Sequence, residues 1–304
     1  MRIHTLLHCL AALAVLALAP TLLHAQSKIL YVAPGQTDPA IAAIHGPNLA
    51  LYDTQAASRH RLFLFFVGTG GNATNSLAMA RIIARWGYHV ISLDYDNNVI
   101  TVACAHSLDP TAFDHYRQAI ITGAPVSDIV KVPAPDAILN RFQKLLAYLV
   151  THDPQGGWDE FMQDDKPAWN KIIVAGHSQG SGHAAYLGKM FNVDRVLIFS
   201  GPQDYLDDLR QPAPWLSGHS ATPPSRFFAF LSQNDPFNVN HQETNCLMLM
   251  QLPKLKTLAV KPGEPVQGGY HIMVNDFPKK QAHGSTISTR FTNVWDYMLK
   301  EKVN

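Results

Sequence analysis

Short apolar runs alternate along the chain with segments whose apolar residues recur at helical spacing. Residues 62–67 read LFLFFV, a continuous apolar run followed by glycines. Such a run is typical of a strand buried on both faces of a parallel sheet. Residues 75–87 then show helical spacing and end in a glycine, and residues 88–97 are again strand-like. The order strand, helix, strand predicts an α/β fold.

The same alternation continues through the second half of the chain. Residues 111–151 are mostly helical in pattern, and residues 171–201 form a second strand, helix and strand. We expect further strands at residues 28–35, 47–54, 226–235 and 256–260, the last of these closing the sheet, and further helices at residues 241–252 and 286–302. This reading gives about eight strands, mostly parallel, in one central sheet with helices on both faces.

Two segments, residues 201–225 and 261–285, show no clear periodicity. Long loops without secondary structure of their own are often functional. Residues 201–225 carry several large apolar side chains, and we expect them to serve either as an apolar wall over the site or as ordinary surface packing.

The first 25 residues are expected to be a secretory signal peptide. Arg2 precedes an apolar run over residues 6–19, and small residues follow, ending at Ala25. The run is shorter than the about 20 residues of a membrane-spanning helix. Cleavage after Ala25 would leave residues 26–304 as one domain, secreted or periplasmic, with no stable membrane span. An uncleaved membrane anchor is the alternative.

The composition and charge of the chain further limit the possible classes of function. The net charge is +1 and no run of Lys or Arg occurs, so nothing indicates a nucleic-acid partner. The fifteen histidines form no HExxH pair, and we expect no metal and no cofactor. Cys104 and Cys246 remain after Ala25, and an exported protein can form a disulfide, but the sequence does not say whether these two meet.

Residues 176–180 read GHSQG and match the pattern G-x-S-x-G. Ser178 follows the strand KIIVA and precedes a helix, which is the context that this pattern requires of a nucleophile. The strand must turn sharply into the helix, and the flanking glycines relieve the crowding. The alternative is a tight turn whose serine caps the helix.

The chain resembles the α/β-hydrolase superfamily on this motif and its surroundings, most clearly from Arg61 to the C-terminus. The resemblance implies a three-layer α/β-hydrolase fold and a triad in the order serine, acid, histidine. Asp235, in FFAFLSQNDPF, matches the acid, and Asp204, one strand earlier, is the rival. His283, in KKQAHGSTI, matches the histidine, and His271 is its rival. His177 and His183 are expected to pack rather than to react.

The resemblance also implies two backbone N–H donors for an oxyanion. One is that of Gln179, directly after Ser178, and the other comes from the loop VGTGGN, where we expect Thr69, with Gly70 second. Many family members carry His-Gly in this loop, whereas this chain has Val67-Gly68.

Taken together, these residues predict an exported serine hydrolase that cleaves small-molecule or lipid esters through Ser178, His283 and Asp235. A peptidase, thioesterase or acyltransferase using the same triad is one alternative, and a non-catalytic binding protein of this fold is another. Protein partners and oligomeric state cannot be inferred from the sequence.

Overall fold

The computed structural model describes residues 27–303, and their central feature is a nine-stranded sheet with the order β1-β2-β4-β3-β7-β8-β11-β13-β12. The strands are β1 (Ser27–Val32), β2 (Asn48–Asp53), β3 (Leu62–Phe66), β4 (His89–Ser92), β7 (Ile172–His177), β8 (Arg195–Phe199), β11 (Phe227–Ser232), β12 (Thr257–Ala259) and β13 (Ile272–Asn275). Only β2 runs against its neighbours, and every other pairing in the sheet is parallel. The predicted α/β class and the mostly parallel sheet are confirmed.

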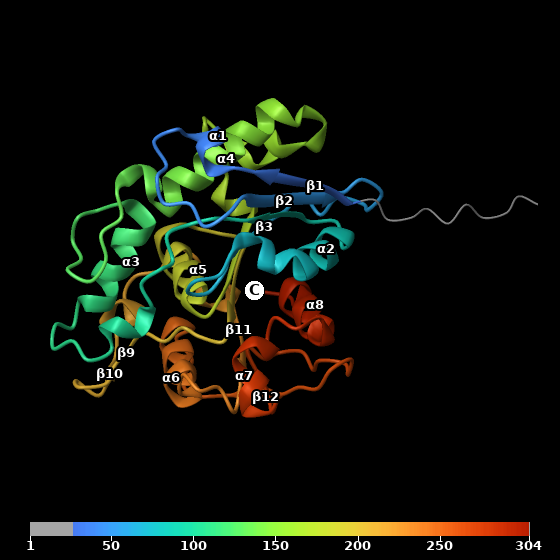
Figure 1. The fold of residues 1–304 in the computed structure, drawn as a ribbon. Coiled ribbons are helices and arrows are strands. Elements are labelled where there is room, and N and C mark those ends of the chain that lie inside the picture. Colours follow the sequence, from blue (N-terminus) through green and yellow to red (C-terminus); the bar gives the residue numbers. More distant parts are fainter. Residues whose placement is uncertain (1–26, 304) are drawn as a thin grey trace, which may run out of the picture.

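Helices cover both faces of this sheet, as predicted (Figure 1). On one side lie α2 (Leu77–Arg85) and α8 (Thr292–Lys300), and on the other lie α3 (Ala112–Thr122) and α5 (Gln179–Met190). The remaining longer helices are α4 (Ile138–His152), α6 (Val239–Leu249) and α7 (Lys279–Ser285), and a single turn, α1 (Pro34–Thr37), follows β1. Two pairs of two-residue strands, β5 (Met162–Gln163) with β6 (Lys166–Pro167) and β9 (Tyr205–Leu206) with β10 (Gln211–Pro212), lie outside the main sheet.

The core follows the apolar runs of the sequence. All five residues of β3 and all six of β11 are buried, as expected for strands covered on both faces. In α8, Val294, Trp295 and Met298 form the buried side. Parallel strands end at one edge of the sheet, so the loops after β3, β7, β8, β11 and β13 gather there.

Two expectations about the C-terminal third are corrected. Residues 256–260 contain a strand, β12, but it is an edge strand and not the last one, because β13 follows and lies between β11 and β12. Residues 261–285 therefore contain β13 and α7. The sequence did not predict these two elements, because the periodicity of their apolar residues is weak. Both elements are short, and their positions depend on pairing with β11 and on packing against it.

The segment 201–225 is mostly irregular, as expected, but it is not a wall over the site. Its largest apolar side chains, Leu206, Trp215 and Leu216, are buried in the core. Cys104 and Cys246 are both buried free thiols, so they do not form a disulfide. The expected signal peptide lies outside the described residues. In the part of the chain that the structure describes, none of the helices has the length and apolar character needed to cross a membrane.

Candidate active site

Ser178 occupies the turn between β7 and α5, with φ 56° and ψ −123°. Few L-residues adopt a positive φ, and residues held in strained conformations cluster at functional sites, although other non-glycine residues of this chain, such as His60 and Arg210, also have a positive φ. The flanking glycines permit the turn: a Cβ on Gly176 would lie 2.1 Å from the Gly180 carbonyl oxygen, and one on Gly180 would lie 2.2 Å from that of Phe66. Since both contacts are with backbone, no larger residue fits at either position.

His283 and Asp235 meet at the same edge of the sheet. Asp235 follows β11 and His283 lies in α7, and the two carboxylate oxygens of Asp235 lie 2.9 and 3.1 Å from His283 Nδ1. The Asp235 side chain is fully buried and also accepts the Phe237 N–H at 2.9 Å. Burial alone raises the pKa of the Asp235 carboxyl, but the imidazole and the Phe237 N–H outweigh it, and the pKa falls below its usual value. The carboxylate is therefore ionised at neutral pH and fixes the proton of His283 on Nδ1.

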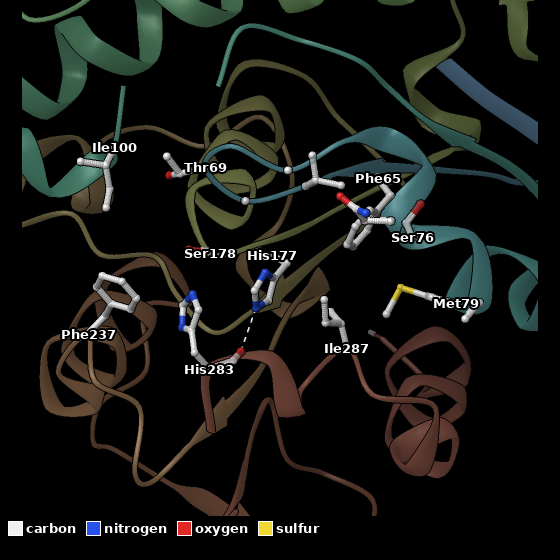
Figure 2. A pocket seen from close by; sticks show the side chains of 15 residues that line it. Phe65, Thr69, Ser76, Met79, Ile100, His177, Ser178, Phe237, His283 and Ile287 are labelled. Atoms are coloured by element: carbon white, nitrogen blue, oxygen red, sulfur yellow. Dashed lines mark hydrogen bonds between the residues drawn. The ribbon is translucent and has the colours of Figure 1, made fainter. Parts of the chain in front are cut away.

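Ser178 and His283 open on one cavity of about 490 Å³. In Figure 2 the His283 ring is directed toward Ser178. The hydrogen bonds recorded over residues 27–303 include none between the Ser178 hydroxyl and this ring. Catalytic hydrogen bonds are often long in ligand-free sites and tighten when substrate binds. Proton transfer from Ser178 requires its hydroxyl to come within hydrogen-bond reach of His283 Nε2.

The backbone carbonyl of His283 is held by two donors. His177 Nε2 donates to it at 2.8 Å (Figure 2). Ser200 Oγ donates to it at 2.7 Å. Burial and the neighbouring charge of His283 lower the pKa of His177 to about 4, so His177 is neutral near pH 7 and carries its proton on Nε2. His177 thus does more than pack: it links the residue before the nucleophile to the backbone of the base.

The expected oxyanion donors lie close to Ser178. A Cβ on Gly68 would sit 3.0 Å from the Ser178 Cβ, so the loop after β3 passes directly beside the nucleophile. Thr69 Oγ1 donates to Gln179 Oε1 at 2.5 Å, which ties this loop to the start of α5. Gly70 does not fit the role, because its N–H donates to the Asn97 carbonyl at 3.2 Å. Among residues 27–303, the backbone N–H groups of Thr69 and Gln179 have no recorded acceptor.

The rival acid is engaged elsewhere. Asp204 forms a fully buried ion pair with Arg117, with an N–O distance of 2.6 Å, and accepts the Trp215 indole N–H at 3.1 Å. Arg117 also donates to the Gln179 carbonyl at 2.8 Å. Asp204 therefore supports the packing of α3 against α5.

The rival histidine is at the wrong edge of the sheet. His271 precedes β13, and its Nδ1 lies 2.9 Å from the Phe227 carbonyl oxygen at the start of β11. Because β11 and β13 are parallel, their starts lie at the opposite edge from Ser178. His183 is buried within α5 beside Tyr95, as expected of a packing residue.

The cavity wall is mainly apolar and comes from five parts of the chain. Its lining residues are Phe65, Val67, Gly68, Thr69, Gly71, Asn75, Ser76, Ala78, Met79, Ile100, His177, Ser178, Phe237, His283 and Ile287. Within this lining, histidines are the only titratable side chains. Sequence analysis singled out Ser178, His283 and Asp235, which the structure brings together, but not this wall, since no local pattern shows which apolar side chains are left facing a cavity.

Within residues 27–303, no three His, Cys, Asp or Glu side chains gather in a way that would hold a metal ion. No family model matches the chain, and no curated protein matches it in sequence. Among solved structures, "Bacterial Heroin Esterase" is similar, with 15% sequence identity and a TM-score of 0.43, over 90% of this chain and 82% of that chain.

Proposed function

We propose that this protein is a serine hydrolase that cleaves carboxylic esters through Ser178, His283 and Asp235. One observation carries the proposal: a serine held at positive φ and a carboxylate-bound imidazole open on the same apolar cavity. Nucleophile, base and orienting acid are the three parts that nucleophilic acyl transfer needs.

The reaction follows from the positions of these groups. His283 Nε2 takes the Ser178 proton while Oγ attacks the ester carbon, and Asp235 stabilises the imidazolium through Nδ1–H. The N–H groups of Gln179 and Thr69 receive the negative charge that develops on the carbonyl oxygen. Imidazolium then protonates the leaving alkoxide, and the C–O bond breaks. Water, deprotonated by the same imidazole, hydrolyses the acyl-enzyme. Loss of one N–H donor is expected to cost about 3–4 kcal/mol of transition-state stabilisation.

The test is hydrolysis of nitrophenyl esters by the parent protein and by Ser178→Ala. We expect the variant to lose at least about 10⁴-fold in kcat with no change in its thermal unfolding. Ser217→Ala, at an exposed serine of the segment after β8, is the matched control and should retain full turnover. Turnover by Ser178→Ala within tenfold of the parent would refute the mechanism. Thioester and anilide substrates measured in parallel identify the bond that is cleaved fastest.

We also infer that the protein is exported and that cleavage after Ala25 yields the mature chain. The basis is the charged start, short apolar run and small residues at positions 1–25. Expression of the full chain in a bacterium should release a protein beginning at Gln26 into the periplasm. N-terminal sequencing that finds Met1 on the recovered protein would contradict this.

A further inference from the structure

The candidate nucleophile and base divide the cavity into two sides, as Figure 2 shows. On one side, here called the inner arm, lie Phe65, Ser76, Met79 and Ile287, and on the other, the outer side, lie Thr69, Ile100 and Phe237. Ser178 and His283 lie between them. A substrate attached at Ser178 can therefore extend in two directions.

The two sides differ in their access to solvent. On the inner arm, Phe65 and Met79 are only 2% and 4% exposed. On the outer side, Ile100 is 40% exposed and Thr69 is also exposed. The inner arm thus has a buried floor beneath α2, with the exposed residues Asn75 and Ala78 beside it in the lining, whereas none of the residues named on the outer side is buried.

The inner arm offers mainly apolar surface. Asn75, exposed and next to Ser76, adds an amide whose oxygen already accepts the Asn72 N–H at 2.7 Å. The Ser76 hydroxyl donates to the Ala73 carbonyl at 2.8 Å, so its proton is already used within the turn that begins α2. No Asp, Glu, Lys or Arg lies in the described lining of the cavity. A charged group placed there would lose its hydration without compensation, whereas an apolar chain would gain from burial.

We propose that the inner arm binds the acyl group and the outer side the alcohol, so that the substrates are uncharged esters of apolar carboxylic acids with variable alcohols. This inference rests on the proposed function. It assigns the specificity for chain length to Met79 and Ile287, and it makes Ile100 a contact of the leaving group.

The order of events at the site supports this assignment. Cleavage breaks the ester C–O bond and forms the Ser178 Oγ–C bond, and the alkoxide leaves with the proton that His283 gives it. Water must then reach the place that the alcohol vacated, because the same imidazole deprotonates it. The outer side, where none of the named lining residues is buried, therefore suits the leaving group. The acyl group stays attached to Ser178 through both steps, so the arm with the buried floor of Phe65 and Met79 suits it.

The experiment measures kcat/KM over two ester series with the full protein. The first series keeps nitrophenol and lengthens the acyl chain from acetate to decanoate. The second series keeps acetate and lengthens a primary aliphatic alcohol from ethyl to octyl. Its hydrolysis is measured from the acid that is released. In the parent, kcat/KM should rise by up to about fourfold per methylene along the acyl series and then stop rising when the inner arm is full. Along the alcohol series the change per methylene should be smaller.

Variants assign each side. Met79→Trp should lower kcat/KM for octanoate relative to acetate by at least tenfold and leave the ratio of octyl to ethyl acetate within twofold. Since Met79 is buried and a larger side chain there can prevent folding, Ile287→Trp, at a half-buried position of the same arm, provides the second measurement. Ile100→Trp should change the alcohol ratio and not the acyl ratio. Leu108→Trp, 73% exposed and outside the cavity lining, is the control and should change neither.

The opposite pattern, in which inner-arm variants change the alcohol ratio, overturns the assignment while leaving the serine hydrolase intact. So does an acyl ratio that none of the inner-arm variants alters in folded protein. Absence of Ser178-dependent turnover on every ester overturns the proposed function itself, and the assignment with it.

Discussion

Asp235→Asn removes one charge from the candidate triad and leaves the shape of the side chain nearly unchanged. In the parent, the Asp235 carboxylate accepts from His283 Nδ1 at 2.9 Å and from the Phe237 N–H at 2.9 Å. Asparagine can still accept the Phe237 N–H through its oxygen. Its amide then points an N–H at Nδ1, and the imidazole responds by moving its proton to Nε2. That tautomer has no lone pair with which to deprotonate Ser178.

The size of the effect follows from this change of tautomer. Loss of the orienting carboxylate in a serine triad lowers kcat by about 10⁴-fold, or about 5.5 kcal/mol. The cost to stability should be small, about 1 kcal/mol, because one hydrogen bond persists and the burial of a charge is relieved. Activity and stability should therefore separate almost completely in this variant.

Asp204→Asn is the matched control and should show the reverse pattern. It leaves the Arg117 guanidinium, which is fully buried, without its anion. Breaking a buried ion pair from one side costs about 3–5 kcal/mol, a large share of the 5–15 kcal/mol that is typical of a folded domain. For a protein of this size that corresponds to a melting temperature about 10 °C lower. The kcat of the folded fraction should stay within about tenfold of the parent.

The assay pairs nitrophenyl ester turnover with thermal unfolding followed by circular dichroism, on both variants at one pH. We expect Asp235→Asn to be folded and inactive, and Asp204→Asn to be active and less stable. The reasoning is refuted if Asp235→Asn keeps more than about a tenth of the parent kcat. It is equally refuted if Asp204→Asn, folded at the assay temperature, loses turnover as completely as Ser178→Ala.

Three further predictions concern the turn and the groups that hold the base. Gly180→Ala places a Cβ against the Phe66 carbonyl and should lower the free energy of unfolding by at least about 2 kcal/mol in urea titration; an unchanged midpoint would contradict the steric account. Ser200→Ala removes one of the two donors to the His283 carbonyl and should lower kcat by about tenfold at nearly constant KM, whereas a change in KM alone would argue against a positioning role. Between pH 6.5 and about 4, unfolded chains take up a proton on His177 that the folded protein refuses, so stability should fall as the pH falls, by up to about 3 kcal/mol; His177→Gln should lose this part of the pH dependence, and equal slopes would exclude it.

Features with strong local signals could be read from the sequence. The β3 run and residues 172–175 of β7 are apolar throughout because both faces of these strands are covered. Such a run can be recognised without knowing which strands pair with it. Ser178 stands out because the glycines around it form a contiguous motif, although the carbonyl that excludes a Cβ at Gly180 belongs to Phe66 on β3.

Features decided by distant partners could not be read in this way. Asp204 and Asp235 both follow apolar strands. They differ because Asp204 forms an ion pair with Arg117, which lies 87 positions earlier in the chain. His177 and His283 are 106 positions apart, so nothing near His177 indicates the bond between them. β13 has only four residues and depends on its neighbours β11 and β12 for its place.

The apolar segment 201–225 illustrates the same limit. Its composition suits a wall over a site equally well as a surface packed against the core, because both bury apolar area. Trp215 is in fact directed to Asp204, whose buried carboxylate accepts its indole N–H. This bond, to an acid 11 positions earlier, and the burial of Leu206 and Leu216 place the segment against the core.

The most direct test of the central claim is the site at which a serine-directed phosphonate attaches. The protein would be treated with a fluorophosphonate, and the mass of the intact chain would be measured by mass spectrometry. The modified residue would then be located by digestion and peptide mapping, with Ser178→Ala treated in parallel. The account predicts one adduct per chain, located on Ser178, and none on the variant. An adduct on another serine, or an unmodified parent chain that still hydrolyses esters, would contradict it.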